Sequence, residues 1–217
     1  MTEEETHPLP DGFILDDAEK LVVGTFPPSG WENKEHFFFY ASPLNQFWNV
    51  IDRALDFQGT EKQLKWTKNR GFQESERANR EKLKLFCKQK KIGFIDVFTK
   101  VRRTKVDATK DVDLIPVQSV IENGKLSAIL AKHPIKRICC VYKTAYKALK
   151  DGLISNPAFE IETLMENCLA NGEKLQLNHN GKQIEVLLLY PATRSPYPMD
   201  LRVKQYCKFL LSTSDTD

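Results

Sequence analysis

Four short apolar runs constrain the fold of this chain more than any other feature. Each is rich in Val, Ile, Leu and Phe and is almost continuously apolar, without a polar residue at every second position. Strands that are buried on both faces have this pattern, and they belong mainly to parallel sheets. The runs cover residues 20–24, 92–97, 135–142 and 184–190.

The segments between these runs have helical periodicity. Strands that alternate with helices predict right-handed crossovers and an α/β fold, in which helices cover both faces of a mostly parallel sheet. A turn at 178–182 predicts that 175–177 pairs locally with the fourth run. At 217 residues the chain suits one substantial core, so we expect a single domain over 13–211 with tails at 1–12 and 212–217. The predicted helices cover 43–57, 74–90, 113–131, 144–152, 155–170 and 200–211.

Charge is unevenly distributed along the chain. The formal net charge is +3, yet residues 62–105 hold 15 Lys and Arg against 4 Asp and Glu. Such a segment suits a surface that faces a polyanion. A solvated helix face whose lysine stems lie over the core would show the same pattern, so charge alone does not choose between the two.

Several classes of protein are excluded by what the pattern lacks. No apolar run approaches the roughly 20 residues of a membrane span, and the acidic start has no apolar leader segment, so we expect a cytoplasmic protein without membrane contact. The cysteines at 87, 139, 140, 168 and 207 are scattered, which favours buried free thiols over a zinc or iron–sulfur site. We therefore expect no metal site.

Two segments near the N-terminus are candidates for a ligand site. Loops at the carboxyl ends of strands in open α/β sheets are where ligands bind, and the loop 24–28 follows the first run. Gly24 allows close backbone approach and Phe26 can stack on a ring. In the segment 39–48, packing of the predicted helix into the core accounts for the final Phe-Trp pair. It does not account for Asn45, whose amide can hold a water molecule or contact the edge of a base. Aromatic rings, a glycine and an amide suit a nucleobase.

Two further segments lie at predicted strand ends. The loop 190–198 combines three prolines with Thr193, Arg194 and Ser195; such a stiff polar loop can clamp a phosphate backbone, or it can simply connect to the last helix. Asp96 ends the second run and is either a pocket carboxylate or an ion-pair partner of a nearby arginine.

The order of these segments resembles the uracil-DNA glycosylase superfamily, and most closely its hypoxanthine (deoxyinosine)-DNA glycosylase branch. The segments are Gly-Thr-Phe-Pro at 24–27, Phe-Tyr-Ala-Ser-Pro-Leu-Asn-Gln-Phe-Trp at 39–48, Gly-Phe-Ile-Asp-Val at 93–97 and Tyr-Pro-Ala-Thr-Arg-Ser-Pro at 190–196. The resemblance implies a three-layer α/β/α sandwich with a central four-stranded, mostly parallel sheet. It also implies hydrolysis of an N-glycosidic bond without a cofactor.

The resemblance assigns roles to individual residues. The hypoxanthine branch uses the Asn before Phe-Trp to position the attacking water, and the resemblance assigns this catalytic role to Asn45. The first loop here has no Asn or Asp of its own. The branch has a His and an Arg where this chain has Ser42 and Leu44, which leaves the excised base open. The implied base pocket contains Gly24, Thr25, Phe26, Pro27, Tyr40 and Ser42. The implied DNA contacts are Thr193, Arg194 and Ser195, to which the basic segment adds Arg102 and Arg103.

Three functions follow as hypotheses. The first is a monomeric DNA glycosylase of base-excision repair that flips out and removes a deaminated base, uracil or hypoxanthine. The second is a nucleic-acid-binding protein of the same fold without catalysis, and the third is a hydrolase of a small molecule such as a nucleoside. Salt-sensitive DNA binding without base release would select the second; activity on free nucleosides without DNA affinity would select the third.

Overall fold

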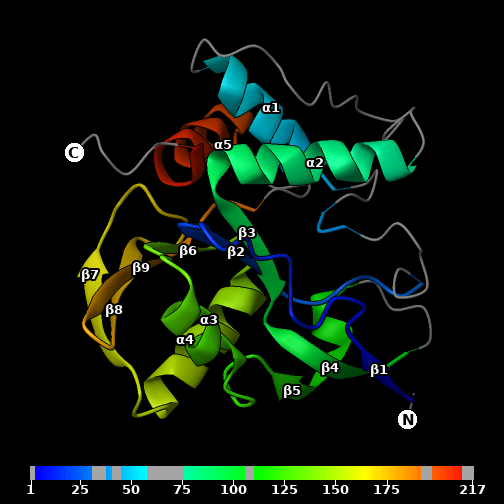
Figure 1. Cartoon of the computed structure of the whole chain (residues 1–217), viewed down its shortest axis with the longest axis vertical. Helices are drawn as coiled ribbons and strands as arrows, with labels where there is room; N and C mark the ends of the chain where they lie inside the picture. The colour runs from blue at the N-terminus through cyan, green and yellow to red at the C-terminus, as the bar shows by residue number, and fades with distance from the viewer. Residues whose placement is uncertain are drawn as a thin grey trace.

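The computed structural model describes residues 3–30, 38–40, 45–57, 76–105, 110–191 and 197–211. They form an α/β protein with a six-stranded sheet in the order β3-β2-β6-β9-β8-β7 and a three-stranded sheet in the order β1-β4-β5 (Figure 1). The strands are β1 (Glu4–Thr6), β2 (Lys20–Gly24), β3 (Ile92–Asp96), β4 (Phe98–Arg103), β5 (Leu114–Ser119), β6 (Arg137–Cys140), β7 (Glu160–Met165), β8 (Glu173–His179) and β9 (Lys182–Leu188). The helices are α1 (Phe47–Phe57), α2 (Glu76–Lys90), the 3-10 turn η1 (Asp111–Asp113), α3 (Lys125–Lys132), α4 (Lys143–Ser155), α5 (Met199–Tyr206) and the π-helical turn η2 (Cys207–Leu211).

The four apolar runs form the parallel core of the larger sheet. They become β3, β2, β6 and β9, which are neighbours in that order and pair in parallel. The expected number of four strands is wrong, because β8 and β7 extend this core through antiparallel pairs. The turn at 178–182 forms the predicted β8–β9 hairpin, with Asn180 and Gly181 both at positive φ.

Helices cover both faces of the larger sheet. Figure 1 shows α1, α2 and α5 on one side of it and α3 and α4 on the other. Two buried clusters match these sides: one joins α1, α2 and α5 to Val22 and Phe94, and the other joins α3 and α4 to Leu21 and Ile95. Because neighbouring residues of one strand point to opposite faces, the continuous apolar runs supply both clusters.

Two predicted helices are wrong in part. The segment 113–131 contains β5 before α3, because the β-branched Ile115 and Val117 flank Pro116, and this stretch pairs with β4. The segment 155–170 contains β7 rather than a helix. In both segments, pairing with another strand overrides a weak local periodicity.

The N-terminal segment also differs from the expected tail. Glu4–Thr6 pairs with Arg102, Val101 and Lys100 of β4 as an antiparallel strand, and the following His7 is buried. The described part of 1–12 is therefore packed onto the domain. The expected C-terminal tail, 212–217, lies outside the described residues.

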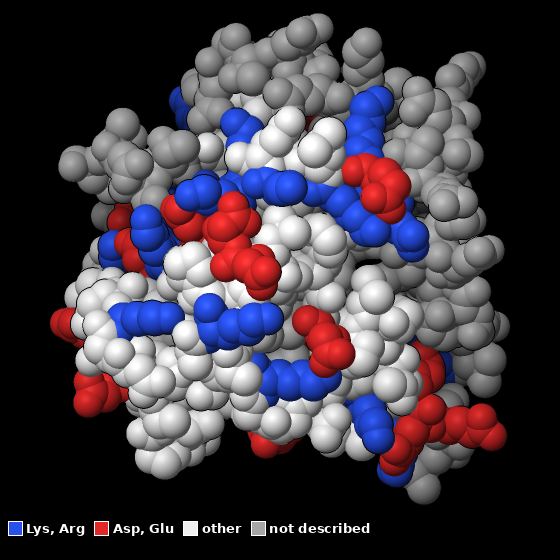
Figure 2. Space-filling view, viewed as in Figure 1, with Lys and Arg blue, Asp and Glu red and all other residues white. Residues whose placement is uncertain are grey.

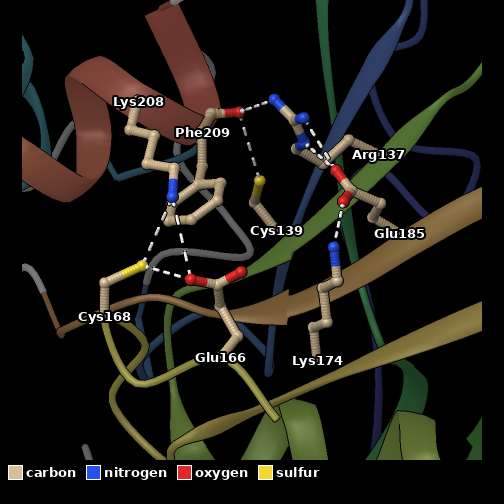
Figure 3. A network of polar contacts seen from close by, with 8 residues as sticks. All are labelled: Arg137, Cys139, Glu166, Cys168, Lys174, Glu185, Lys208 and Phe209. Carbon is tan, nitrogen blue, oxygen red and sulfur yellow. Dashed lines mark hydrogen bonds and ion pairs between the residues drawn. The ribbon is translucent and has the colours of Figure 1, made fainter. Parts of the chain in front are cut away.

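A polar network attaches the end of the chain to the sheet (Figure 3). Arg137 Nη1 and Cys139 Sγ both donate to the backbone oxygen of Phe209 in η2, at 3.0 and 3.9 Å. Arg137 also forms an ion pair with Glu185, and Glu185 forms a second ion pair with Lys174. Burial acts to raise the pKa of Glu185, but these two cations lower it below its ordinary value. The network attaches η2 to β6 of the larger sheet.

The prediction of buried free thiols is confirmed for four of the five cysteines. Cys87, Cys139, Cys140 and Cys207 are buried and Cys168 is exposed, and none of the five forms a disulfide. None of the described helices combines the length and the apolar character needed to cross a membrane.

Candidate functional site

The carboxyl ends of β2, β3 and β6 lie side by side at one edge of the sheet. The parallel register pairs Gly24 with Asp96 and Val23 with Cys140, so the three strands end at nearly the same level. Loops at such an edge can reach a common ligand. Polar side chains from distant parts of the chain gather at these strand ends and form the candidate site.

Gly24 marks the point where the strand ends are most crowded. A Cβ atom at this position would overlap Asp96 Oδ1 and Tyr40 Oη. Burial, with a contribution from Asp96, raises the pKa of Tyr40 far above its ordinary value, so its hydroxyl remains protonated. Tyr40 Oη is buried and, within the part of the chain that the structure describes, has no hydrogen-bond partner. Only glycine leaves room for both oxygen atoms.

His7 enters the site from the end of β1. Its Nδ1 accepts a hydrogen bond from the backbone N–H of Leu9 at 2.9 Å, which places the ring proton on Nε2. Nε2 then donates to Asp96 Oδ2 at 3.0 Å. The imidazole also stacks on Phe39 and meets the ring of Phe26 edge-on. The side chains of His7 and Asp96 are only 1% and 7% exposed, so this pair is closed to solvent.

Asp111 reaches the same edge from η1. Its Oδ2 accepts a hydrogen bond from Thr25 Oγ1 at 2.8 Å, and the side chain of Thr144 lies close enough to affect its pKa. Burial raises the pKa of Asp111; nearby Asp96 adds to the rise, while the two hydroxyls and Arg103 oppose it. A carboxyl group that holds its proton unusually tightly therefore lies between the first loop and α4.

Asn45, the predicted water-positioning residue, lies immediately before α1. Its Oδ1 accepts a hydrogen bond from the backbone N–H of Phe47 at 2.9 Å, as a helix-capping residue does. Its Nδ2 donates to Tyr142 Oη, also at 2.9 Å. Burial raises the pKa of Tyr142 despite this hydrogen bond, so the phenol stays neutral. The amide is thus held rigidly beside the end of β6, and its catalytic role stays a prediction.

The first loop is packed inside the protein. Thr25 is 2% and Phe26 8% exposed. Arg103 lies with its guanidinium carbon 5.7 Å from the centre of the Phe26 ring, and it donates to the backbone oxygen of Pro27 at 2.8 Å. The same guanidinium pairs with Glu5 at 2.8 Å. These contacts fix the loop 24–27, of which every residue was predicted for the base pocket.

The predicted DNA contacts divide into two groups. Arg102, which is partly exposed, pairs with Glu4 at 2.5 Å. Arg103 is buried behind the loop, contrary to the expectation of a surface contact, because β1 supplies its carboxylate partner. Ser42 and the segment 193–195 lie outside the described residues.

An open groove borders the site on α4. Its volume is about 410 Å³, and Lys143, Thr144, Lys147, Ala148 and Asp151 line it. Thr144 links the groove to Asp111, and α4 begins directly after Tyr142. Lys143 and Lys147 are exposed and, among the described residues, neither forms an ion pair. The groove is a cationic surface next to the strand ends.

A second basic surface lies on α2. Figure 2 shows a band of lysine and arginine side chains over this helix, which carries Arg80, Lys82, Lys84, Lys88 and Lys90. The surface confirms that part of the predicted basic segment is exposed. Residues 62–75 of that segment lie outside the described residues.

Three members of the site were not predicted as such: His7, Asp111 and Tyr142. His7 and Asp111 had no local signal, since neither lies on a strand or helix of recognisable periodicity. Tyr142 had a weak signal, because it ends the third apolar run. Asp96 is buried and pairs with His7 and not with Arg102 or Arg103; its role as a pocket carboxylate stays a prediction.

The described residues contain no group of three or more His, Cys, Asp or Glu side chains placed to hold a metal ion.

No protein-family model matches the chain, and no curated protein matches its sequence. Among solved structures, it is similar to the solution structure of a protein described as a "putative Uracil DNA glycosylase" from Methanosarcina acetivorans. The two are 21% identical, with a TM-score of 0.40, and the match covers 65% of this chain and 76% of the other.

Proposed function

We propose that this protein is a DNA glycosylase that hydrolyses the N-glycosidic bond of a deaminated base, uracil or hypoxanthine. The observation that carries the proposal is the convergence of Thr25, Asn45, Asp96 and Asp111 at the joined carboxyl ends of three parallel strands. The ordered motifs that resemble the uracil-DNA glycosylase superfamily supply Thr25, Asn45 and Asp96. The convergence places an amide, two carboxylates and neutral phenols at one edge.

These residue types suit cleavage of a glycosidic bond. Its transition state has oxocarbenium-ion character, so that positive charge develops on the sugar while negative charge develops on the leaving base. Carboxylates near the sugar stabilise the first charge, and fixed donors stabilise the second. In the proposed reaction, Asn45 orients the attacking water, while the neutral hydroxyls of Tyr40 and Tyr142 shape a rigid pocket around the base.

The groove on α4 extends this proposal to the DNA backbone. Lys143 and Lys147 lie one helical turn apart and face the solvent, which matches the spacing at which side chains share a helix face. In the proposed complex they contact phosphates next to the flipped nucleotide. Such contacts position the DNA without reading its sequence.

Removal of these two charges is expected to weaken DNA binding mainly at low salt. For the double variant Lys143→Gln/Lys147→Gln, the slope of log K against log salt concentration should become shallower by about 0.9 for each phosphate that is no longer neutralised. Fluorescence anisotropy of a labelled duplex over a salt series measures this slope.

A matched control is available at the amino end of the same sheet. Lys132→Gln/Lys136→Gln removes the same charge from residues that pair with Asp16 and Glu19, just before β6. This variant should keep the parental slope. Equal slopes for both double variants would show that only net charge matters and that the groove does not bind DNA.

The glycosylase activity itself is tested with a panel of oligonucleotides. Each carries uracil, hypoxanthine, xanthine or a mismatched thymine, in single- and double-stranded form, and abasic sites are revealed by alkaline cleavage. We expect release of uracil or hypoxanthine from DNA and no release from the corresponding free nucleosides. Salt-sensitive binding without any release would instead identify a non-catalytic binder, and nucleoside cleavage without DNA affinity a small-molecule hydrolase.

A further inference from the structure

Hydrolysis at this site needs a group that accepts a proton, and Asn45 cannot provide it. An amide orients water through its oxygen but is not a base at neutral pH. In addition, Asn45 Oδ1 already accepts the backbone N–H of Phe47, and Nδ2 donates to Tyr142. A carboxylate at the strand ends can take the proton of the attacking water.

Two carboxylates are present there, and their surroundings differ. Asp96 is closed in: His7 occupies its Oδ2, and Gly24 and Tyr40 lie against its Oδ1. Asp111 is only half-buried, and its hydrogen bond from Thr25 leaves further lone pairs on the carboxylate. Thr144, whose side chain lies close to Asp111, lines the open groove on α4. Asp111 thus has access to solvent and to the proposed path of the DNA.

We propose that Asp111 is the general base of the reaction and removes a proton from the attacking water. This inference rests on the glycosylase function proposed above. The water oxygen forms a bond to C1′ of the sugar as the C1′–N bond breaks, and the electron pair of that bond leaves with the base. One water proton passes to Asp111, which later returns it to the departing base or to solvent.

The position of Asp111 explains a feature of the first loop. That loop has no carboxylate or amide of its own between Gly24 and Pro28. Thr25 Oγ1 instead holds Asp111 Oδ2 at 2.8 Å, which brings a carboxylate from η1 to the end of β2. The segment between β4 and β5 therefore supplies what the loop itself lacks.

The charged neighbours of Asp111 set the pH at which it acts. Asp96 on β3 and burial favour the protonated form, whereas Arg103 on β4 favours the carboxylate. Tyr142, which follows β6, is neutral, Thr25 donates a hydrogen bond to Asp111, and the nearby Thr144 hydroxyl also favours the carboxylate. The net effect is a raised pKa. A base must be deprotonated to work, so kcat should rise with pH through this raised value.

The test compares Asp111→Asn with Asp113→Asn. Asparagine at 111 keeps an acceptor for Thr25 but cannot take a proton, so we expect kcat to fall by about 10²- to 10⁴-fold with unchanged DNA affinity. The acid limb of the pH profile should also disappear. Asp113 lies in the same turn, where it accepts from Thr104 at 3.2 Å, and its variant should keep the parental kcat and pH profile.

Two further measurements separate a base from a structural residue. In Asp111→Ala, added formate should restore part of the lost kcat, because a small carboxylate can occupy the vacated position.

The second measurement is the pH dependence of stability. A carboxyl group whose pKa is raised in the folded state stabilises the fold below its unfolded pKa, and this contribution is lost as pH rises through the folded pKa. Asp111→Asn should therefore be more stable than the parent at neutral pH in urea unfolding, with the difference shrinking in acid.

The outcomes distinguish this inference from the function on which it rests. If the parent protein releases bases and Asp111→Asn releases them at the same rate, Asp111 is not the base, while the glycosylase function stands. The same conclusion follows if Asp113→Asn loses as much activity as Asp111→Asn. If the parent releases no base from any oligonucleotide, both proposals are overturned.

Discussion

Asn45→Ala is expected to reduce base release from uracil- or hypoxanthine-containing DNA by about 10²- to 10³-fold, the usual effect of removing one fixed polar group from a transition state. The substitution removes both hydrogen bonds of the amide, to Phe47 and to Tyr142. Single-turnover kinetics on the preferred oligonucleotide measure the loss, because they report the chemical step without product release.

The control for this prediction must reproduce the loss of a helix- or turn-capping amide. Loss of such a cap costs about 1 kcal/mol of stability. Asn156 has the same local geometry, since its Oδ1 accepts the N–H of Ala158 two residues later at 3.0 Å. Asn156→Ala should lose similar stability and keep full activity.

A second variant, Asn45→Ser, separates folding from catalysis. Serine retains a capping oxygen but has no amide to reach Tyr142 or to orient water. It should therefore unfold like the parent and remain as inactive as Asn45→Ala. Parental rates in Asn45→Ser would exclude Asn45 as the water-positioning residue.

Gly24→Ala is expected to have the second large effect, a loss of about 1–3 kcal/mol of unfolding free energy. The new methyl group would occupy the space of Asp96 Oδ1 and Tyr40 Oη. Neither oxygen can move easily, because Asp96 is held by His7 and the tyrosine is packed among aromatic rings. Urea denaturation followed by circular dichroism measures the change.

Gly152→Ala provides the comparison. Its methyl group would meet the flexible end of Ile121 from within α4, where alanine gains about 1 kcal/mol of helix propensity over glycine. Its net effect should be small. If Gly24→Ala proves equally mild, the strand ends are less tightly packed around Gly24 than the structure indicates.

Much of the fold could be predicted because its signals are local. The apolar runs that became β2, β3, β6 and β9 are recognisable within a few residues each, and burial on both faces requires their continuous pattern. The hairpin of β8 and β9 had an equally local signal at Asn180-Gly181. β5 and β7 had none, because their partners determine them: Ile115 lies opposite Arg102, and Ile161 opposite Leu177.

The sequence by itself determined which strands form the parallel core and which loops follow their ends, because hydrophobic continuity and turn residues act over short distances. Which polar side chains meet there depends on how distant segments pack in the folded chain. His7 and Asp96 are 89 residues apart, Thr25 and Asp111 are 86 apart, and Asn45 and Tyr142 are 97 apart. No local pattern encodes such contacts, because each depends on two distant segments arriving at the same edge of the sheet.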